Sequence, residues 1–263
     1  LTYYRFNKKV NPNEGLINNL IGIRSFHMFN KKVVSAVTLS LLAFSMNASA
    51  EDKEEAVDFS NPTAVYSAAD VNIGTDGAAL GLTLAGEVTK DWAFLGKAEI
   101  RENGDLFRIR AATTSNRLGS GFLIDYTKHN DFHKDIKDSK SETLVLNAMQ
   151  VLPFNEGKTM LVPLVGVGYT KNDFAIGRTN IWMAQAMIIH NWTDNIWTNV
   201  MPTYTRSFSD MKMNDGISKE GISSFGAEVV TGYRFKGNQN VRLHLKYNDQ
   251  NDNQAWVAYT YAF

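Results

Sequence analysis

Charged side chains recur at every second position in several short stretches of this sequence. The clearest rows are Lys97, Glu99 and Arg101; Arg108 and Arg110; and Arg242, His244 and Lys246. In a β-strand, alternate side chains point to opposite faces of the sheet, so each row would gather its charges on one face. Guanidinium and ammonium groups gathered in this way bind anions through charge-assisted hydrogen bonds. The rows are therefore the first candidates for a solute-binding surface.

The sequence contains no strong catalytic or metal-binding pattern. A serine nucleophile on a strand needs a histidine two positions away on the same face, and that spacing does not occur between residues 51 and 263. Histidine and aspartate alternate from His129 to Asp135 and could bind a divalent cation, but the interleaved lysines favour a solvated loop. We interpret His190 and His244 as structural. The sequence thus predicts no catalytic residue, no metal and no cofactor.

The first fifty residues have the composition of a secretory signal. Residues 28–50 begin near two lysines, continue with an apolar run of twelve residues and end in Ala-Ser-Ala. The apolar run is shorter than the roughly twenty residues that a membrane helix needs. We expect a signal peptide over residues 28–50 that is cleaved before Glu51, and we interpret residues 1–27 as an over-extended gene start.

The predicted mature chain is mildly acidic. Residues 1–50 hold six of the 27 basic side chains and one of the 27 acidic ones, which leaves 21 basic against 26 acidic side chains and a formal charge of −5. That balance gives no basis for nucleic-acid binding. The sequence has no cysteine, which excludes disulfides and thiolate metal sites.

The remainder of the chain reads as a series of short strands. Residues 51–62 are acidic and patternless, and we interpret them as a short periplasmic N-terminal segment. From residue 63 onward, segments of about ten residues with alternating, β-branched or aromatic character are separated by turn residues. The expected strands are 63–73, 78–89, 92–101, 105–114, 120–128, 141–152, 158–169, 177–192, 196–206, 221–235, 241–247 and 253–263.

The last strand has a pattern of its own. Residues 253–263 (NQAWVAYTYAF) alternate with a period of two and end on Phe263. This stretch resembles the closing strand of a Gram-negative outer-membrane β-barrel protein. The resemblance implies an all-β fold with residues 63–263 in a single closed antiparallel transmembrane β-barrel. The twelve expected strands give the barrel its strand number. The resemblance further implies outer-membrane lipid and lipopolysaccharide as surroundings and contact of the C-terminal strand with the assembly machinery. A secreted β-sandwich is the soluble alternative.

The lengths of the connections agree with a barrel. If both termini lie in the periplasm, every turn on that side is short, and the longest connections, 129–140 and 207–220, fall on the extracellular side, as in outer-membrane barrels. Aromatic residues fall at both strand ends, as expected of two membrane interfaces. The predicted periplasmic set is Trp92, Trp192, Trp197, Tyr233 and Tyr261, and the predicted extracellular set is Tyr126, Tyr169, Trp182, Tyr204 and Tyr247.

Alternation also assigns an inner face, because Arg or Lys facing lipid at mid-membrane costs roughly 2 to 4 kcal/mol. The predicted lumen-lining side chains are Glu87, Lys97, Glu99, Arg101, Arg108, Arg110, Asp125, Glu228, Arg234, Arg242, His244 and Lys246. They line a solute pathway in one interpretation. In the other, the four carboxylates pair with the cations and fill the interior. Pro163 and Pro202 lie inside expected strands and indicate either bulges or a segment folded into the lumen.

The sequence favours a narrow porin-like channel for the passive passage of small hydrophilic solutes, with a basic bias that suits anionic ones. Two alternatives stay open. One is a hydrolase of lipid or lipopolysaccharide, which the missing serine and histidine spacing disfavours. The other is a surface-binding or structural barrel that acts through its extracellular loops.

Overall fold

The structure is a computed structural model, and it describes residues 57–61, 64–131, 139–250 and 253–263. The predicted gene-start extension, the signal peptide and most of the N-terminal segment lie outside these residues. No helix in the described part of the chain is long and apolar enough to span a membrane.

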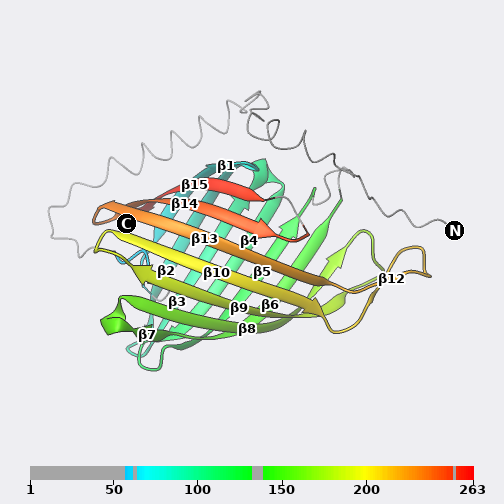
Figure 1. The fold of residues 1–263 in the computed structure, drawn as a ribbon, viewed down its shortest axis with the longest axis horizontal. Coiled ribbons are helices and arrows are strands. Elements are labelled where there is room, and N and C mark those ends of the chain that lie inside the picture. Colours follow the sequence, from blue (N-terminus) through cyan, green and yellow to red (C-terminus); the bar gives the residue numbers. More distant parts are fainter. Residues whose placement is uncertain (1–56, 62–63, 132–138, 251–252) are drawn as a thin grey trace, which may run out of the picture. The chain divides into compact units, whose positions relative to one another are not determined.

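Twelve strands form the wall of a barrel (Figure 1). They are β1 (Ala68–Gly74), β2 (Gly77–Thr89), β3 (Trp92–Arg101), β4 (Leu106–Ser115), β5 (Ser120–His129), β6 (Ser141–Gln150), β8 (Thr159–Asn172), β9 (Thr179–Asn191), β10 (Ile196–Ser207), β13 (Ser223–Lys236), β14 (Gln239–Asn248) and β15 (Gln254–Ala262). The short strand β7 (Leu152–Phe154) continues β6 in the same register against β8. The prediction of a 12-stranded antiparallel barrel is confirmed.

The sheet closes on itself through its first and last strands. Each strand pairs antiparallel with its neighbour along the chain, and β15 pairs with both β14 and β1. The register places Ala68 opposite Ala262, and the Phe263 amide donates a hydrogen bond of 2.9 Å to the Ser67 carbonyl. Closure pairs each of the twelve wall strands on both sides, so none of them presents a free sheet edge. The predicted partners of the C-terminal strand are thus confirmed.

Strand boundaries differ from the expected ones by a few residues. The largest difference is at β1, which begins at Ala68 rather than at residue 63. The connection from 208 to 222 also contains a hairpin that the sequence pattern did not predict, β11 (Met211–Lys212) and β12 (Lys219–Glu220). Two-residue strands are too short to show a periodicity of their own.

The two prolines in the wall cause neither a bulge nor an inward fold. Pro163 is paired with Ala186 in a ladder of constant register. At Pro202 the pairing to β9 is interrupted, and the same register resumes at Thr203. The missing N–H of proline therefore removes single ladder bonds without displacing the strands. The two register shifts of the barrel wall lie instead near the periplasmic ends of β2 and β13.

The short and long connections separate to opposite ends of the barrel, as predicted. The turns 90–91, 116–119, 192–195 and 237–238 lie at the end where the C-terminus lies. The longer connection 208–222 lies at the opposite end, and so do the last residues of β5 and the first of β6, which the other long connection joins (Figure 1). We refer to these ends as periplasmic and extracellular.

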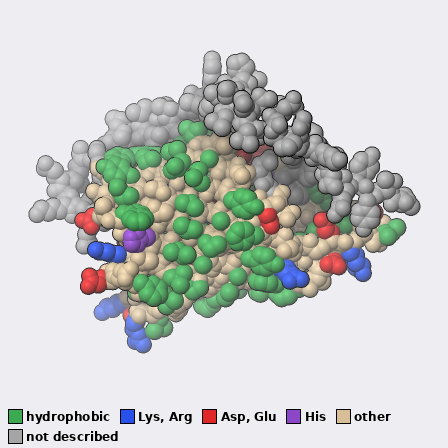
Figure 2. All heavy atoms as spheres, in the orientation of Figure 1, with side chains coloured by type: hydrophobic (Ala, Val, Ile, Leu, Met, Phe, Trp, Pro, Cys, Tyr) green, Lys and Arg blue, Asp and Glu red, His purple; other side chains and the backbone are tan. Residues whose placement is uncertain are grey.

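The outer surface of the wall is apolar. Large hydrophobic side chains with 40% exposure or more occupy the outward positions of neighbouring strands, including Leu82, Phe94, Ile124, Val167 and Leu243. Figure 2 shows hydrophobic side chains spread over the wall, with charged side chains gathered toward the two ends. A band of this kind suits contact with lipid.

Nine of the ten aromatic residues in the two predicted belts fall on the outward parity of the wall. Trp197 does not, and that prediction was wrong. Its side chain is only 6% exposed, and a Cβ on Gly232 would lie 2.2 Å from its ring. Trp197 fits inside the barrel because Gly232, directly opposite on β13, carries no side chain. The position of Trp197 at a strand end does not reveal that a glycine lies opposite it on the partner strand.

Candidate functional site

The charged rows of β1, β3 and β4 meet inside the barrel in one ion-pair network. The Lys97 ammonium lies 2.9 Å from Asp70 Oδ1 and 3.0 Å from Glu99 Oε1. The Arg110 guanidinium lies 3.1 Å from the other oxygen of Glu99. Glu99 and Asp70 are almost fully buried. Buried carboxylates of this kind require paired cations, because the desolvation cost is otherwise large.

Two further pairs extend the network around the wall. Arg108 on β4 binds Asp125 on β5 through two donors, with Nε donating to Oδ1 at 2.9 Å and Nη2 donating to Oδ2. On the other side, His244 Nδ1 on β14 lies 2.7 Å from Glu228 Oε1 on β13. Of the four carboxylates predicted to pair with lumenal cations, Glu99 and Asp125 pair with Lys or Arg, and Glu228 pairs with the His244 imidazole. The fourth, Glu87, has an exposed side chain near the periplasmic end of β2.

Four cations of the predicted set have no carboxylate partner among the described residues: Arg234 at the periplasmic mouth, and Arg101, Arg242 and Lys246 in the interior. The Arg101 guanidinium lies 4.8 Å from the ring centroid of Trp256, and Arg242 donates to Thr260 Oγ1 at 2.8 Å. Lys246 has no ion pair within the described part of the chain. Between the two mouths the described interior holds six Lys and Arg side chains against four carboxylates, a formal surplus of two positive charges. The carboxylates therefore do not neutralise all the Lys and Arg side chains of the interior, and its net charge is positive.

An apolar wall faces the charged one. The inward positions of β8 are Met160, Val162 and Leu164, all buried, and those of β9 include Ile181 and Ile189. These inward apolar side chains explain why β8 and β9 are apolar on both parities of the sequence. One side of the interior therefore carries the charges, and the other side carries aliphatic and methionine side chains.

The N-terminal segment 57–61 enters the periplasmic mouth. The Val57 amide donates to the Gly237 carbonyl at 2.9 Å. The Val57 carbonyl accepts a hydrogen bond of 2.9 Å from Arg234 Nη1. The Phe59 ring stacks on Trp197 at 6.5 Å between centroids and meets the edge of Tyr66 at 5.2 Å. Arg234, predicted to line the lumen, thus holds this segment at the mouth.

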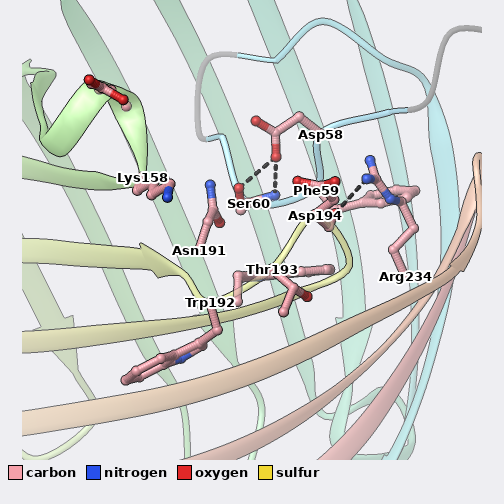
Figure 3. A pocket seen from close by; sticks show the side chains of 12 residues that line it. Asp58, Phe59, Ser60, Lys158, Asn191, Trp192, Thr193, Asp194 and Arg234 are labelled. Carbon is pink, nitrogen blue, oxygen red and sulfur yellow. Dashed lines mark hydrogen bonds between the residues drawn. The ribbon is translucent and has the colours of Figure 1, made fainter.

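Segment 57–61 lies between two cavities. The periplasmic cavity, of about 480 Å³, is lined by Asp58, Lys158, Asp194 and Arg234, with Phe59 and Trp197 at its inner side. Figure 3 shows the segment on one side of this cavity and the β9–β10 turn on the other, with the Trp192 indole pointing away. The inner cavity, of about 260 Å³, is lined by the charged network and again by Phe59 and Trp197. The two cavities therefore adjoin at the Phe59–Trp197 stack.

A separate pair lies at the extracellular end of the barrel. Residues 102–104 form the short 3₁₀ helix η1 (Glu102–Gly104), and His129 Nε2 lies 2.6 Å from Glu102 Oε2. Burial alone would raise the pKa of Glu102, but the hydrogen bond and charge of His129 outweigh it and lower that pKa from its ordinary value. Glu102 is therefore an ionised group at the rim.

Several interior residues were missed by the sequence analysis. Asp70 and Asn72 alternate with Val71 and Ile73 on β1, so the parity rule applied to the other strands would have found them. Trp256 lies on the inner face of β15, where His244 stacks on it at 4.7 Å. Phe59 gave no signal, because a segment without periodicity does not reveal that it enters a barrel.

Within the part of the chain that the structure describes, contacts across strands add no catalytic or metal-binding constellation. In the described residues, no group of three or more His, Cys, Asp or Glu side chains could hold a metal ion. Thr159 Oγ1 lies 2.9 Å from His190 Nδ1, but the His190 ring packs against the Trp192 ring, and no carboxylate of the described residues orients the imidazole. A threonine and histidine pair without a third group does not make an activated nucleophile. The expectation that the chain is no enzyme stays a prediction.

The fold defines the class of protein: a closed, all-β antiparallel barrel with the build of an outer-membrane β-barrel. No protein-family model and no curated protein sequence matches the chain.

Several solved structures resemble it. The NanC porin is 8% identical with a TM-score of 0.47, over 75% of this chain and 98% of that one. The KdgM porin, in complex with disordered oligogalacturonate, is 8% identical with a TM-score of 0.44, over 76% and 99%. The COG4313 outer membrane channel from Pseudomonas putida F1 is 11% identical with a TM-score of 0.47, over 81% and 100%. At these identities the resemblance is one of fold and assigns no residue a role.

Proposed function

We propose that this protein is a narrow channel of the Gram-negative outer membrane that passes small hydrophilic anions passively, after export through a signal over residues 28–50. The observation that carries the proposal is the surplus of two positive charges inside a closed barrel whose outer surface is apolar. The predicted lumen-lining set, from Glu87 to Lys246, is proposed to line this path.

The preference for anions follows from where the surplus lies. Arg101, Arg242 and Lys246 come from β3 and β14, and the inner face of β15 lies beside them with Trp256. Charges of one sign inside low-dielectric walls focus the field and raise the local concentration of counter-ions. An anion entering from the extracellular side meets Arg101, Arg242 and Lys246, none of which forms an ion pair with a described carboxylate.

The restriction to small solutes follows from the packing of the interior. Cross-strand ion pairs occupy part of the cross-section, and the inner cavity measures about 260 Å³. The Phe59–Trp197 stack stands between this cavity and the periplasmic mouth. We infer that this stack is the narrowest point of the path.

Planar-bilayer recording of the purified, folded protein tests the proposal. We expect discrete low-conductance openings and, under a salt gradient, a reversal potential on the anion-selective side. No current above the protein-free blank, with folding confirmed by the heat-dependent gel shift of barrels, would rule out a channel. A cation-selective reversal potential would overturn only the anion preference.

A further inference from the structure

On the outer face of β5, β6 and β8, the side chains change from apolar to charged at the same height near the extracellular end. On β5 the outward residues run from Phe122 through Ile124 and Tyr126 to Lys128. Neighbouring β6 and β8 repeat this order at matching register positions, with Leu146, Leu144 and Glu142 on β6 and Val167, Tyr169 and Lys171 on β8. Lys128, Glu142 and Lys171 are direct cross-strand partners. A charged row thus lies immediately beyond a tyrosine-containing row, on the outside of the barrel.

The single carboxylate of this row, Glu142, is hydrogen-bonded to Tyr169 and forms no ion pair with either lysine. The Tyr169 hydroxyl donates to Glu142 Oε1 at 2.8 Å, and the Arg178 guanidinium lies 4.3 Å from the Tyr169 ring centroid. Neither Lys128 nor Lys171 forms an ion pair with any described residue, although both flank Glu142. The Asp173 carboxylate, next along the chain, accepts the Lys140 amide at 2.8 Å. The outward patch of Lys128, Lys171 and Arg178 therefore holds three cations beside the single carboxylate of Glu142 and keeps a net positive charge.

The height of the patch on the wall indicates what it meets. Amphipathic aromatic rings settle at the level of lipid headgroups, and Tyr126 and Tyr169 lie one register step below Lys128 and Lys171. Side chains at that level and pointing away from the interior meet the headgroups of the outer leaflet. Two strand spacings separate Lys128 from Lys171, a span of about 10 Å. A headgroup with more than one phosphate can reach both.

We propose that Lys128, Lys171 and Arg178 form a binding site for the phosphorylated glycolipid of the outer leaflet. Each lysine donates to a phosphate oxygen, and Arg178, fixed over Tyr169, supplies a planar donor for bidentate contact. The site is separate from the proposed channel, because its residues lie on the opposite parity from the charged network. It rests on the orientation that places the long connections outside the cell.

Binding of purified protein to lipid A in mixed micelles tests the site, with native mass spectrometry as the readout. The probes are bisphosphorylated lipid A, its dephosphorylated form and phosphatidylglycerol. The test variant is Lys128→Gln with Lys171→Gln. The matched control is Lys212→Gln with Lys219→Gln, which removes two exposed lysines from the β11–β12 hairpin at the same end but off the wall.

We expect bisphosphorylated lipid A to bind the wild type, and the Lys128/Lys171 variant to lose about tenfold in affinity, since each basic residue near a charged membrane surface contributes measurably to attraction. The control variant should keep its affinity, and bilayer conductance should be unchanged in both. The proposal is overturned if the two variants lose affinity equally or not at all. Equal binding of the dephosphorylated lipid or of phosphatidylglycerol would also overturn it, because the site would then not read glycolipid phosphate.

Discussion

At the scale of single residues, the interior is organised by which cations have carboxylate partners. Glu99 accepts contacts from both Lys97 and Arg110, while Arg242 has only a hydroxyl partner. Removing the Glu99 charge raises the positive surplus of the lumen, and removing the Arg242 charge lowers it. The two substitutions therefore test the electrostatic basis of the proposed selectivity.

Glu99→Gln should strengthen anion selectivity while weakening the fold. The substitution raises the positive surplus and leaves two part-buried cations without their shared carboxylate, at a cost of about 3 kcal/mol. Reversal potential under a salt gradient measures the first effect, and the urea midpoint of unfolding in detergent or liposomes measures the second. A shift of the reversal potential toward cations would contradict the placement of Glu99 on the path.

Arg242→Gln should move the reversal potential toward zero, because the surplus falls and the glutamine amide can still donate to Thr260. The unfolding midpoint should change little. Lys212→Gln serves as the control, since Lys212 is exposed on the extracellular hairpin. If both variants shift the potential alike, the effect comes from surface charge and not from the interior.

At the scale of elements, segment 57–61 lies at the periplasmic end of the barrel and the β11–β12 hairpin lies at the extracellular end. The segment is held by Arg234 and by the stack of Phe59 on Trp197. The hairpin is closed by Asp215, whose carboxylate accepts the amides of Ile217 at 2.9 Å and Ser218 at 2.8 Å. Each depends on few contacts, so single substitutions should report on it.

Phe59→Ala should raise single-channel conductance severalfold, because it removes the ring that separates the two cavities. Phe208→Ala is the matched control, since Phe208 is an exposed aromatic residue of the extracellular connection. An unchanged conductance in folded Phe59→Ala would place the narrowest point elsewhere.

The turn at Asp215 should loosen in acid. Hydrogen bonds from the side chain and amide of Ser218, and then from the Ile217 amide, lower the pKa of Asp215. A lowered pKa in the folded turn means that its stabilisation is complete above the ordinary aspartate value of about 3.9 and is lost as pH falls through the folded value. NMR titration of the Ile217 and Ser218 amides should show a midpoint below the ordinary value, and Asp215→Asn should abolish the transition. A midpoint at or above the ordinary value would contradict the turn geometry.

At the scale of the whole molecule, assembly depends on an uninterrupted apolar outer face across the seam. Val257 on β15 pairs with Ile73 on β1 and with Leu243 on β14, and all three side chains are half exposed and outward. This seam is where the first and last strands meet. It is therefore the place where a lipid-facing charge would act on closure itself.

Val257→Arg should impair barrel assembly, because a lipid-facing arginine near mid-membrane costs about 2 to 4 kcal/mol. The folded fraction on unheated gels after refolding into liposomes measures this. Ile217→Arg introduces the same charge at a residue 87% exposed in the extracellular hairpin and should refold like the wild type. Equal refolding of the two variants would argue against a lipid-facing seam.

Much of this architecture can be predicted from local sequence patterns. The period of two in residues 253–263, the separated lengths of the connections and the single parity of the charged rows predict twelve strands, their order and the two faces, because each is a property of one strand or one turn. The inward side of Arg108, for example, follows from its neighbours Phe107 and Ile109.

Only the tertiary structure decided which groups meet. Glu99 pairs with Arg110 rather than Arg108, Trp197 lies inward over Gly232, and Phe59 enters the mouth, because each depends on register between strands or on a segment without periodicity. Whether a charge is paired or left in surplus is a property of such contacts. The sequence alone therefore determined a charged inner face, and the contacts across strands decided that part of it stays positive.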